Sequence, residues 1–462
     1  MKKWAGSFYF VKIQLVTMYF NKNLPMTNCT SDRIEFPAFK HRKIEAQFSG
    51  GAITSDGGVL LLRAVDQRLR LTERIARQMD DPRDPHKVQH QVVDLLRQRV
   101  YGLACGYEDL NDHNTLRHDI AFQTALEKDQ ILGSSPTLCR FEQQVNREFM
   151  WRMHEELVEQ FIAAYETAPK SLVLDFDATD DPVHGEQEGR FFHGYYRHYC
   201  FLPLYVFCEH HCLVSYLRPS NIDGAKHSWA ILALLVKRLR QTWPEVDITF
   251  RGDSGFCRHK MLTWCERHGV NYIVGLAKNK RLNRLGQPWI EQARQRYQTE
   301  QKKQRLFTSF QYKAGSWKHK RRVILKAEHM SQGSNPRYIV TNLEGDAQRL
   351  YEKVYCARGE MENRIKEQQL DLFADRTSCS LWWSNQFRLL LSTLAYTLIN
   401  AIRKMALQQT ELARATCATI RLKLFKIGAV VIRNTRRIQL LLSSHYPFQS
   451  LFQLVSQRLC PD

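Results

Sequence analysis

The apolar residues in the first third of the chain recur three and four positions apart, which is the spacing of amphipathic helices. The segments Val59 to Leu69, Val88 to Leu103 and Phe141 to Ala164 all show this spacing. A Ser-Ser-Pro sequence at 134–136 supplies a cap residue and a proline in the first turn of a further helix. We therefore predict a mainly helical N-terminal region over residues 26–165.

From about residue 171 the pattern changes to short apolar strands separated by helices. Ser171–Asp177, Val246–Phe250 and Tyr272–Leu276 are rich in β-branched and aromatic residues. Amphipathic helices lie between them, and the last of these helices has Gly269 as its C-terminal cap. Strands that alternate with helices indicate an α/β core with a mixed sheet, and we assign the first part of this core to residues 166–280.

The rest of the chain divides into three further segments. Residues 281–345 are again strand-like, which predicts a β-rich insertion into the core. Residues 346–408 show helical spacing and form the rest of the core, and residues 409–462 are predicted to be a basic helical C-terminal region. The first 25 residues, 1–25, differ in texture, so we expect a start-site extension or a disordered segment, with Met26 as the true start.

The charge of the chain indicates its partner. Of 462 residues, 44% are hydrophobic and 25% are charged, which is the balance of a folded protein. The 67 Lys and Arg residues outnumber the 47 Asp and Glu residues, and the net charge of +20 favours a polyanion such as DNA. A merely soluble basic protein is the alternative. Nine of these cations lie within 403–437, where a solvated helix face and DNA contact explain them equally well.

Cysteine spacing and hydropathy indicate the compartment. The twelve cysteines are scattered without CxxC pairs, so we expect reduced thiols in a cytoplasm rather than a disulfide scaffold. The longest apolar stretch, Phe387–Ile402, contains Arg388 and Asn400 and is shorter than a membrane span. We therefore expect a core helix there and no membrane partner.

Acidic residues stand at the carboxyl ends of two predicted strands. Asp177 ends the first, and Asp253 ends the second between Gly252 and Gly255, which would allow a sharp turn and leave room for a ligand. Asp175 lies on the same face of its strand as Asp177, so the strand period does not choose between them. Such an Asp is often only a cap or turn former. Acids from adjacent strands can nevertheless meet and bind a hard cation such as Mg²⁺.

A third candidate group lies on the helix predicted around residue 360. Tyr355, Arg358 and Glu362 are spaced three and four residues apart, which places them on one helix face. An aromatic ring, a guanidinium and a carboxylate presented together suit both a metal ion and a DNA phosphate. An ordinary surface pair between Arg and Glu is the alternative.

These motifs resemble those of a known family. From Met26 to the C-terminus the chain is similar to DDE-type transposases of bacterial insertion sequences, specifically the insertion-sequence 1380 family. The strings that carry the resemblance span nearly the whole chain: Gly50–Gly58, Gln98–Leu103, Gly106–Asp112, Leu174–Gly185, Leu217–Gly224, Arg251–Phe256, Gly275–Asn279 and Arg358–Glu367.

The resemblance implies a ribonuclease H-like catalytic core with a β-rich insertion between the second Asp and the Glu. Its catalytic and metal-binding acids would be Asp177, which stands in an Asp-x-Thr sequence, together with Asp253 and Glu362. They would hold two Mg²⁺ ions, for which Mn²⁺ could substitute. By the same resemblance, Tyr355 and Arg358 would contact phosphates of the transposon end.

Further DNA contacts are expected from basic residues outside this triad. The family pattern places a Lys seven residues after the Glu, where this chain has Gln369, and Lys366 one turn earlier is the candidate to replace it. Lys320, Arg321 and Arg322 crowd a turn of the β-rich insertion and are candidates for phosphate contact. The helical N-terminal region is the other candidate for DNA binding.

The function implied is DNA transposition. Water would attack a phosphodiester at the terminal inverted repeat of the element, and the freed 3′-OH would then attack target DNA, so one carboxylate triad could serve both steps. The expected partners are double-stranded DNA, as transposon ends and as target, and a second copy of the chain in a homodimer on DNA, in the bacterial cytoplasm at the nucleoid. A nuclease that does not join is one alternative, and a catalytically inactive or domesticated DNA-binding protein is another.

Overall fold

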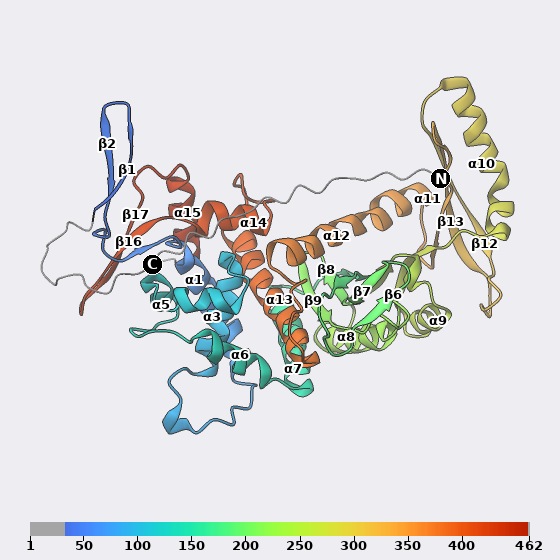
Figure 1. The fold of residues 1–462 in the computed structure, drawn as a ribbon. Coiled ribbons are helices and arrows are strands. Elements are labelled where there is room, and N and C mark those ends of the chain that lie inside the picture. Colours follow the sequence, from blue (N-terminus) through green and yellow to red (C-terminus); the bar gives the residue numbers. More distant parts are fainter. Residues whose placement is uncertain (1–32, 461–462) are drawn as a thin grey trace, which may run out of the picture. The chain divides into compact units, whose positions relative to one another are not determined.

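The structure is a computed structural model that describes residues 33–460 (Figure 1). It divides into two compact units, residues 1–51 and 52–462. In the first unit, strands β1 (Ile34–Phe39) and β2 (Arg42–Ala46) pair as an antiparallel hairpin. The expectation of mainly helical structure was wrong here, because alternating apolar and polar residues such as those of Ile34–Phe36 fit a strand. The predicted extension at 1–25 and the start at Met26 lie outside the described residues.

A nine-stranded mixed sheet forms the centre of the second unit, as the α/β prediction required. Strands β4 (Ser171–Ala178), β10 (Asp247–Gly252) and β11 (Asn271–Leu276) run parallel with β10 in the middle. Strands β8 (Leu204–Cys208) and β9 (His211–Tyr216) continue the sheet beyond β4 in antiparallel pairing. The order of this part is therefore β11-β10-β4-β8-β9.

The strands predicted within 281–345 extend this same sheet. Strand β15 (Arg337–Thr341) pairs with β11, β13 (Arg321–Met330) pairs with β15, and β12 (Gln304–Tyr312) pairs with β13, all antiparallel. The short strand β14 (Gly333–Ser334) pairs with the end of β13. These strands make the segment continuous with the core sheet by hydrogen bonding.

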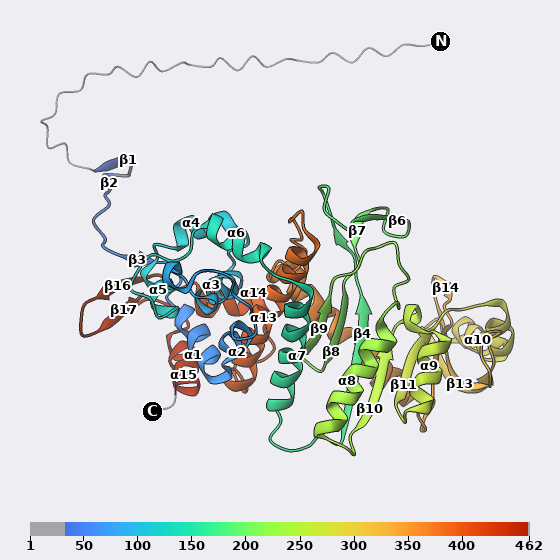
Figure 2. The same ribbon diagram turned by 90° about the horizontal axis from the view of Figure 1, so that it is seen from below.

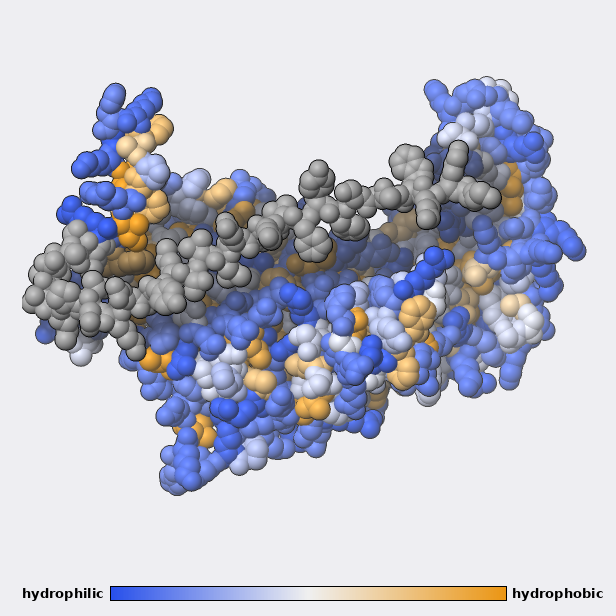
Figure 3. Space-filling view, in the orientation of Figure 1, coloured by the Kyte–Doolittle hydropathy of each residue, from blue (hydrophilic) through white to orange (hydrophobic). Residues whose placement is uncertain are grey.

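A helix that the sequence pattern did not reveal begins this segment. Helix α10 spans Lys280–Glu300 and is capped by Asn279, whose side-chain oxygen accepts a hydrogen bond from the Leu282 amide at 2.9 Å. Only Leu282, Gly286 and Ala293 are buried in it, so its sequence is mostly polar and lacks the broad apolar face of the helices predicted elsewhere. The corresponding part of the surface is mainly hydrophilic, at the upper right of Figure 3.

The two faces of the sheet are covered by different helices. On one face, Leu174, Phe176 and Phe250 belong to one apolar cluster with residues of helices α8 (Ser228–Thr242) and α9 (His259–Arg267). Figure 2 shows both helices on this side of the sheet. The opposite face is covered by a helical run over residues 347–371, which crosses the sheet in Figure 1. This run begins with α11 (Ala347–Arg349), continues through a π-helical turn (Leu350–Tyr355), a 3-10 turn (Cys356–Arg358) and α12 (Gly359–Lys366), and ends with a π-helical turn (Glu367–Asp371).

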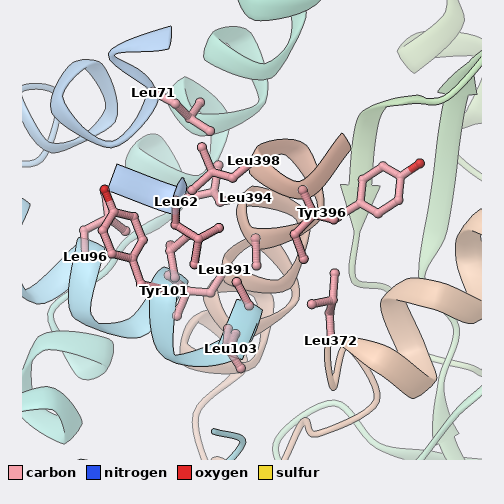
Figure 4. Packing of buried hydrophobic residues seen from close by; sticks show 14 of the residues in the cluster. Leu62, Leu71, Leu96, Tyr101, Leu103, Leu372, Leu391, Leu394, Tyr396 and Leu398 are labelled. Atoms are coloured by element: carbon pink, nitrogen blue, oxygen red, sulfur yellow. The ribbon is translucent and has the colours of Figure 1, made fainter. Parts of the chain in front are cut away.

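The other helices surround α13 (Trp382–Met405), which contains the core helix predicted at Phe387–Ile402. Leu62 and Leu96 pack toward Leu391 and Leu394 of α13 (Figure 4). The helices that contribute to this packing are α1 (Val59–Leu69), α2 (Leu71–Ala76), α3 (Val92–Cys105), α6 (Ser135–Gln143) and α7 (Arg147–Ala163).

The Arg388 side chain, which is 17% exposed, is tolerated in α13 because it has a partner. Its guanidinium donates to the Glu142 carboxylate at 2.7 Å, and Arg99 donates to the same carboxylate at 2.7 Å. Paired charge is tolerated in a core where a lone charge would not be. Among residues 33–460 no helix has both the length and the apolar character that crossing a bilayer requires.

The C-terminal region is not wholly helical, which corrects the expectation for 409–462. Strands β16 (Ala429–Arg433) and β17 (Ile438–Leu442) form a hairpin, and β16 also pairs with β3 (Ile53–Thr54). The run Ala-Val-Val-Ile in β16 favours a strand, and a turn at Asn434 joins the two strands. The flanking helical elements are α14 (Cys417–Ile420), a π-helical turn (Arg421–Phe425) and α15 (Gln449–Leu459).

Several cations of 403–437 hold this region together. Arg403 donates to the buried Glu367 carboxylate at 2.8 Å, and Lys426 pairs with the buried Asp56 carboxylate at 2.8 Å. Arg421 donates to the Ala104 carbonyl at 2.8 Å. For these three residues, contact within the protein explains the charge better than DNA contact or a solvated helix face.

Candidate active site

The parallel register of β4 and β10 brings Asp177 and Asp253 to the same end of the sheet. Asp175 pairs with Arg251 in this register, and Phe176 pairs with Gly252, so Asp177 and Asp253 are the next residues on their strands. Both side chains border one cavity of about 180 Å³. The structure thus brings the two acids expected at the strand ends to the same cavity.

Asp253 is held in place by a tight turn. Its Oδ1 accepts a hydrogen bond from the Gly255 amide at 2.8 Å, and a Cβ on Gly255 would lie only 3.0 Å from that oxygen. Neither Gly252 nor Gly255 has a positive φ, so the room they leave, rather than backbone freedom, explains their presence. Asp253 therefore forms a turn, which was the structural alternative to a metal-binding role, and it also borders the cavity.

Gly275 in β11 is the glycine that this turn needs most. A Cβ at this position would lie 2.7 Å from the Ser254 amide nitrogen and 2.8 Å from the hydroxyl of Tyr355. Both atoms are closer than any real Cβ contact allows, and one of them belongs to the backbone. Gly275 thus lets the Asp253 turn and the Tyr355 ring approach the same point of the sheet.

The helical run 347–371 brings the third carboxylate toward the strand ends. Arg358 donates from Nη1 to Asp177 Oδ2 at 3.1 Å and from Nη2 to Glu362 Oε1 at 2.5 Å. One guanidinium therefore links an acid on β4 with an acid on α12. The helix is wound irregularly just before Arg358, a feature that is frequent at functional sites.

The electrostatics of the site are those of crowded carboxylates. Burial raises the pKa of Asp177 to about 6, with smaller contributions from the negative charges of Asp253 and Glu362, and the positive charge of Arg358 opposes the rise. Burial also raises the pKa of the Tyr355 hydroxyl. The side chain of Asp177 is 17% exposed and that of Glu362 is 44% exposed. Asp177 is thus the more enclosed of these two acids.

The three carboxylates of this site are chemically suited to bind a divalent cation. Carboxylate oxygens are the ligands that Mg²⁺ prefers, and a positive group already lies between Asp177 and Glu362 in the form of the Arg358 guanidinium. Over residues 33–460, however, no three Asp, Glu, His or Cys side chains converge closely enough to hold one ion as arranged. A cation at all three acids would thus require Arg358 to release Asp177 or Glu362.

Asp175, the alternative first acid, is engaged elsewhere. It is 3% exposed, and both of its oxygens accept hydrogen bonds from Arg251, one of them at 2.6 Å. Arg251 also donates to the carbonyl of Val354 and so ties β10 to the helical run. Sequence reasoning missed Arg251, although it follows Asp175 by the same interval that separates Asp253 from Asp177.

The basic residues proposed for DNA contact are placed differently from one another. Lys366 and Lys320 are exposed. Arg321 is 3% exposed and donates to the Glu266 carboxylate at 2.6 and 2.9 Å, so its assignment as a DNA contact was wrong. Arg322 donates to two backbone carbonyls, at 2.9 and 2.7 Å, and so serves the loop that follows β15.

Gln369 lies seven residues after Glu362. Its side-chain nitrogen donates to the carbonyl of Asp180 at 3.1 Å, in the segment that follows β4. Gln369 thus fastens the helical run to the segment that follows the strand carrying Asp177.

Comparison with known proteins gives the class to which this fold and this site belong. The family described as transposase DDE domain group 1 matches residues 36–461, which is most of the chain. The chain therefore belongs to the DDE transposases. Among solved structures, the piggyBac transposase synaptic complex with hairpin DNA is similar at 11% identity and a TM-score of 0.43, over 80% of this chain and 79% of that chain. None of the curated proteins matches the chain.

Proposed function

We propose that this DDE transposase cleaves phosphodiester bonds at the ends of its own DNA element and joins the freed 3′-OH to target DNA. Asp177, Asp253 and Glu362 would be its catalytic acids. One observation carries this proposal: two strand-end carboxylates border a single cavity, and the third is linked to one of them, Asp177, through a shared guanidinium. The motif strings quoted above support the narrower assignment to the insertion-sequence 1380 family.

The sheet supports a ribonuclease H-like core. The order β11-β10-β4-β8-β9, with three parallel strands followed by two antiparallel ones, agrees with that assignment. In this reading, β12, β13 and β15 belong to the insertion between the second Asp and the Glu. The domain boundaries predicted from the sequence, including a DNA-binding helical region over 26–165, are part of this proposal.

The acids would act together on the DNA backbone. Two divalent ions, Mg²⁺ or in its place Mn²⁺, would supply an activated water and neutralise charge on the leaving oxygen when bound at these carboxylates. Asp177 must lose its proton to act as a ligand, and its raised pKa shows that the crowded site resists this in the absence of a bound cation.

Arg358 and Tyr355 would position the DNA. The guanidinium of Arg358 makes two charge-assisted hydrogen bonds to carboxylates, and the same geometry suits a phosphate once one of them is released. The hydroxyl of Tyr355 lies against Gly275 beside the Asp253 turn, where it can donate to a phosphate oxygen. Lys366 and Lys320, being exposed, would add phosphate contacts, and two copies of the chain would hold two ends.

The direct test is Mg²⁺-dependent cleavage of the element's own terminal repeat by the wild type and by Glu362→Gln. We expect Glu362→Gln to bind the DNA but to cleave it at least about 100-fold more slowly, since it removes a metal ligand. Glu360→Gln is the matched control, because Glu360 is exposed on the same helix and should be dispensable. Equal cleavage by the wild type and Glu362→Gln would remove Glu362 from the site.

The alternatives make different predictions in the same assay. A nuclease would cleave the ends but would not join pre-cleaved ends to target DNA. A catalytically inactive or domesticated DNA-binding protein would do neither and would be unaffected by Glu362→Gln. A joined product that depends on Glu362 supports transposition over both.

A further inference from the structure

An aromatic hairpin borders the cavity that holds the two strand-end acids. It consists of β6 (Phe191–His193) and β7 (His198–Phe201), which follow β4 in the chain. The cavity beside Asp177 and Asp253 is also lined by three residues at or near the tip of this hairpin: His193, Tyr195 and Tyr196. Figure 2 shows the hairpin projecting beyond the sheet near the end of β4. Nothing in the proposed chemistry uses these rings.

The rings of this hairpin are exposed to an unusual degree. Tyr195 is 83% exposed, Phe192 56%, Tyr199 47% and Phe191 41%. Phe192 and Tyr199 are paired across the two strands and share one face of the hairpin, Phe191 lies on the other face, and Tyr195 follows at the turn. Single exposed aromatic residues are common, but this number on one short hairpin indicates a binding surface. Pairs of rings also support each other edge to face, with centroids 5.7 Å apart for Phe192 and Tyr199.

Cationic side chains accompany these rings. The guanidinium of Arg190 lies 4.6 Å from the ring centroid of Tyr199, and Arg197 stands at the turn of the hairpin. Aromatic faces that alternate with guanidinium groups form the surface on which unpaired nucleotides stack, because every base has a π-face and every linkage carries a negative charge. A protein partner would not need this combination next to a carboxylate site.

The hairpin is fixed to the core at its base. Ser220 donates to the carbonyl of Phe191 at 2.8 Å, and the Val183 amide donates to the carbonyl of Tyr199 at 2.9 Å. The ring of Phe201 packs edge to face on Trp382, with centroids 5.4 Å apart. The rings therefore stand at a set position relative to the cavity instead of moving freely.

We propose that the β6–β7 hairpin is a stacking platform for unpaired bases of the DNA strand whose phosphate lies at Asp177 and Asp253. The proposal rests on the proposed function and adds the state of the DNA: bases next to the cleavage point leave the duplex and stack on rings that include Phe192 and Tyr195. The platform selects an unpaired strand without reading its sequence, since stacking tolerates any base.

The test uses the full chain and its own terminal repeat with 2-aminopurine at the nucleotides flanking the cleavage point. The labelled tip is left unpaired, so that 2-aminopurine is bright in the free DNA. In metal-free buffer, where no cleavage occurs, stacking on the rings quenches this fluorescence. The double variant Phe192→Leu/Tyr195→Leu keeps apolar bulk without π-faces, and Tyr195→Phe is the matched control. We expect the double variant to lose the quenching and to bind ends with unpaired tips roughly 10-fold more weakly, while Tyr195→Phe behaves as the wild type.

Two results would overturn the proposed platform. Unchanged quenching and affinity in the double variant would overturn the platform. So would a change in oligomeric state in sedimentation without DNA, because it would assign the rings to a contact between copies. Metal-dependent cleavage by the wild type is measured separately, and its absence would contradict the proposed function. If the double variant cleaves the DNA and still quenches the 2-aminopurine fluorescence, only the platform is contradicted.

Discussion

At the scale of single residues, Asp177 makes the stability of the protein depend on pH. Its pKa is about 6 in the folded chain and about 4 in an unfolded one, so the folded state holds the proton more tightly. In metal-free buffer the wild type should therefore lose about 2 kcal/mol of its free energy of unfolding, relative to Asp177→Asn, as the pH rises from about 4 to about 7. Urea unfolding across this range measures the difference. Parallel curves for the two proteins would show that Asp177 is not enclosed in this way.

Asp175 and Asp177 should respond differently to the same substitution. Asp175→Asn leaves the buried Arg251 without its charged partner, which should cost about 3–5 kcal/mol of stability. Asp177→Asn should keep the fold and lose cleavage. Urea unfolding and DNA cleavage are measured on both variants. A stable but inactive Asp175→Asn protein, together with an active Asp177→Asn protein, would make Asp175 the first acid.

At the scale of elements, the site depends on how closely three elements approach. Gly275→Ala would place a Cβ 2.7 Å from the Ser254 amide nitrogen and 2.8 Å from the Tyr355 hydroxyl, so β11, the Asp253 turn and the helical run could not all keep their positions. We expect a loss of about 1–3 kcal/mol in stability and a larger loss of cleavage.

Gly359→Ala is the control for adding a methyl group, since no atom lies within 4 Å of its Cβ position in α12. It should leave the thermal midpoint unchanged or raise it. If Gly275→Ala were as stable and as active as Gly359→Ala, the close approach of the Asp253 turn and Tyr355 to β11 would not be needed for activity.

The elements also show what the sequence can predict. The three parallel strands and α13 were predictable because they are continuous apolar runs, and their acids stand where parallel strands end. Helix α10 was not, because it buries few residues, and β16 was not, because a charged flank obscured its β-branched run. The pairing of Asp175 with Arg251 depends on register, and the exposure of the aromatic hairpin depends on its neighbours. The local pattern of apolar and polar residues contains information on neither the pairing nor the exposure.

At the scale of the whole molecule, segments far apart in the chain share one core. Helices α1 and α3 pack with α13 and with the C-terminal segment, which contributes buried side chains at Ile420, Leu424, Phe425, Val455 and Leu459. Each is worth about 2 kcal/mol when buried, and together they rival the whole stability of a typical domain.

A chain that ends at Met405 should therefore fail to unfold cooperatively. A chain that lacks residues 1–51, which form a separate unit, should keep its transition. Calorimetry of the two shortened chains measures this. A sharp unfolding transition in the chain ending at Met405 would show that the core does not need the C-terminal segment.

We propose that Asp253 binds a metal ion in a site that cuts DNA, and Asp253→Cys tests this most directly. A thiolate is a poor ligand for Mg²⁺ and a better one for Mn²⁺. The account predicts that Asp253→Cys cleaves the terminal repeat at least about 100-fold more slowly than the wild type in Mg²⁺ and recovers about 10-fold or more in Mn²⁺. Glu360→Cys should cleave as the wild type in both. Wild-type cleavage by Asp253→Cys in Mg²⁺ would contradict the account.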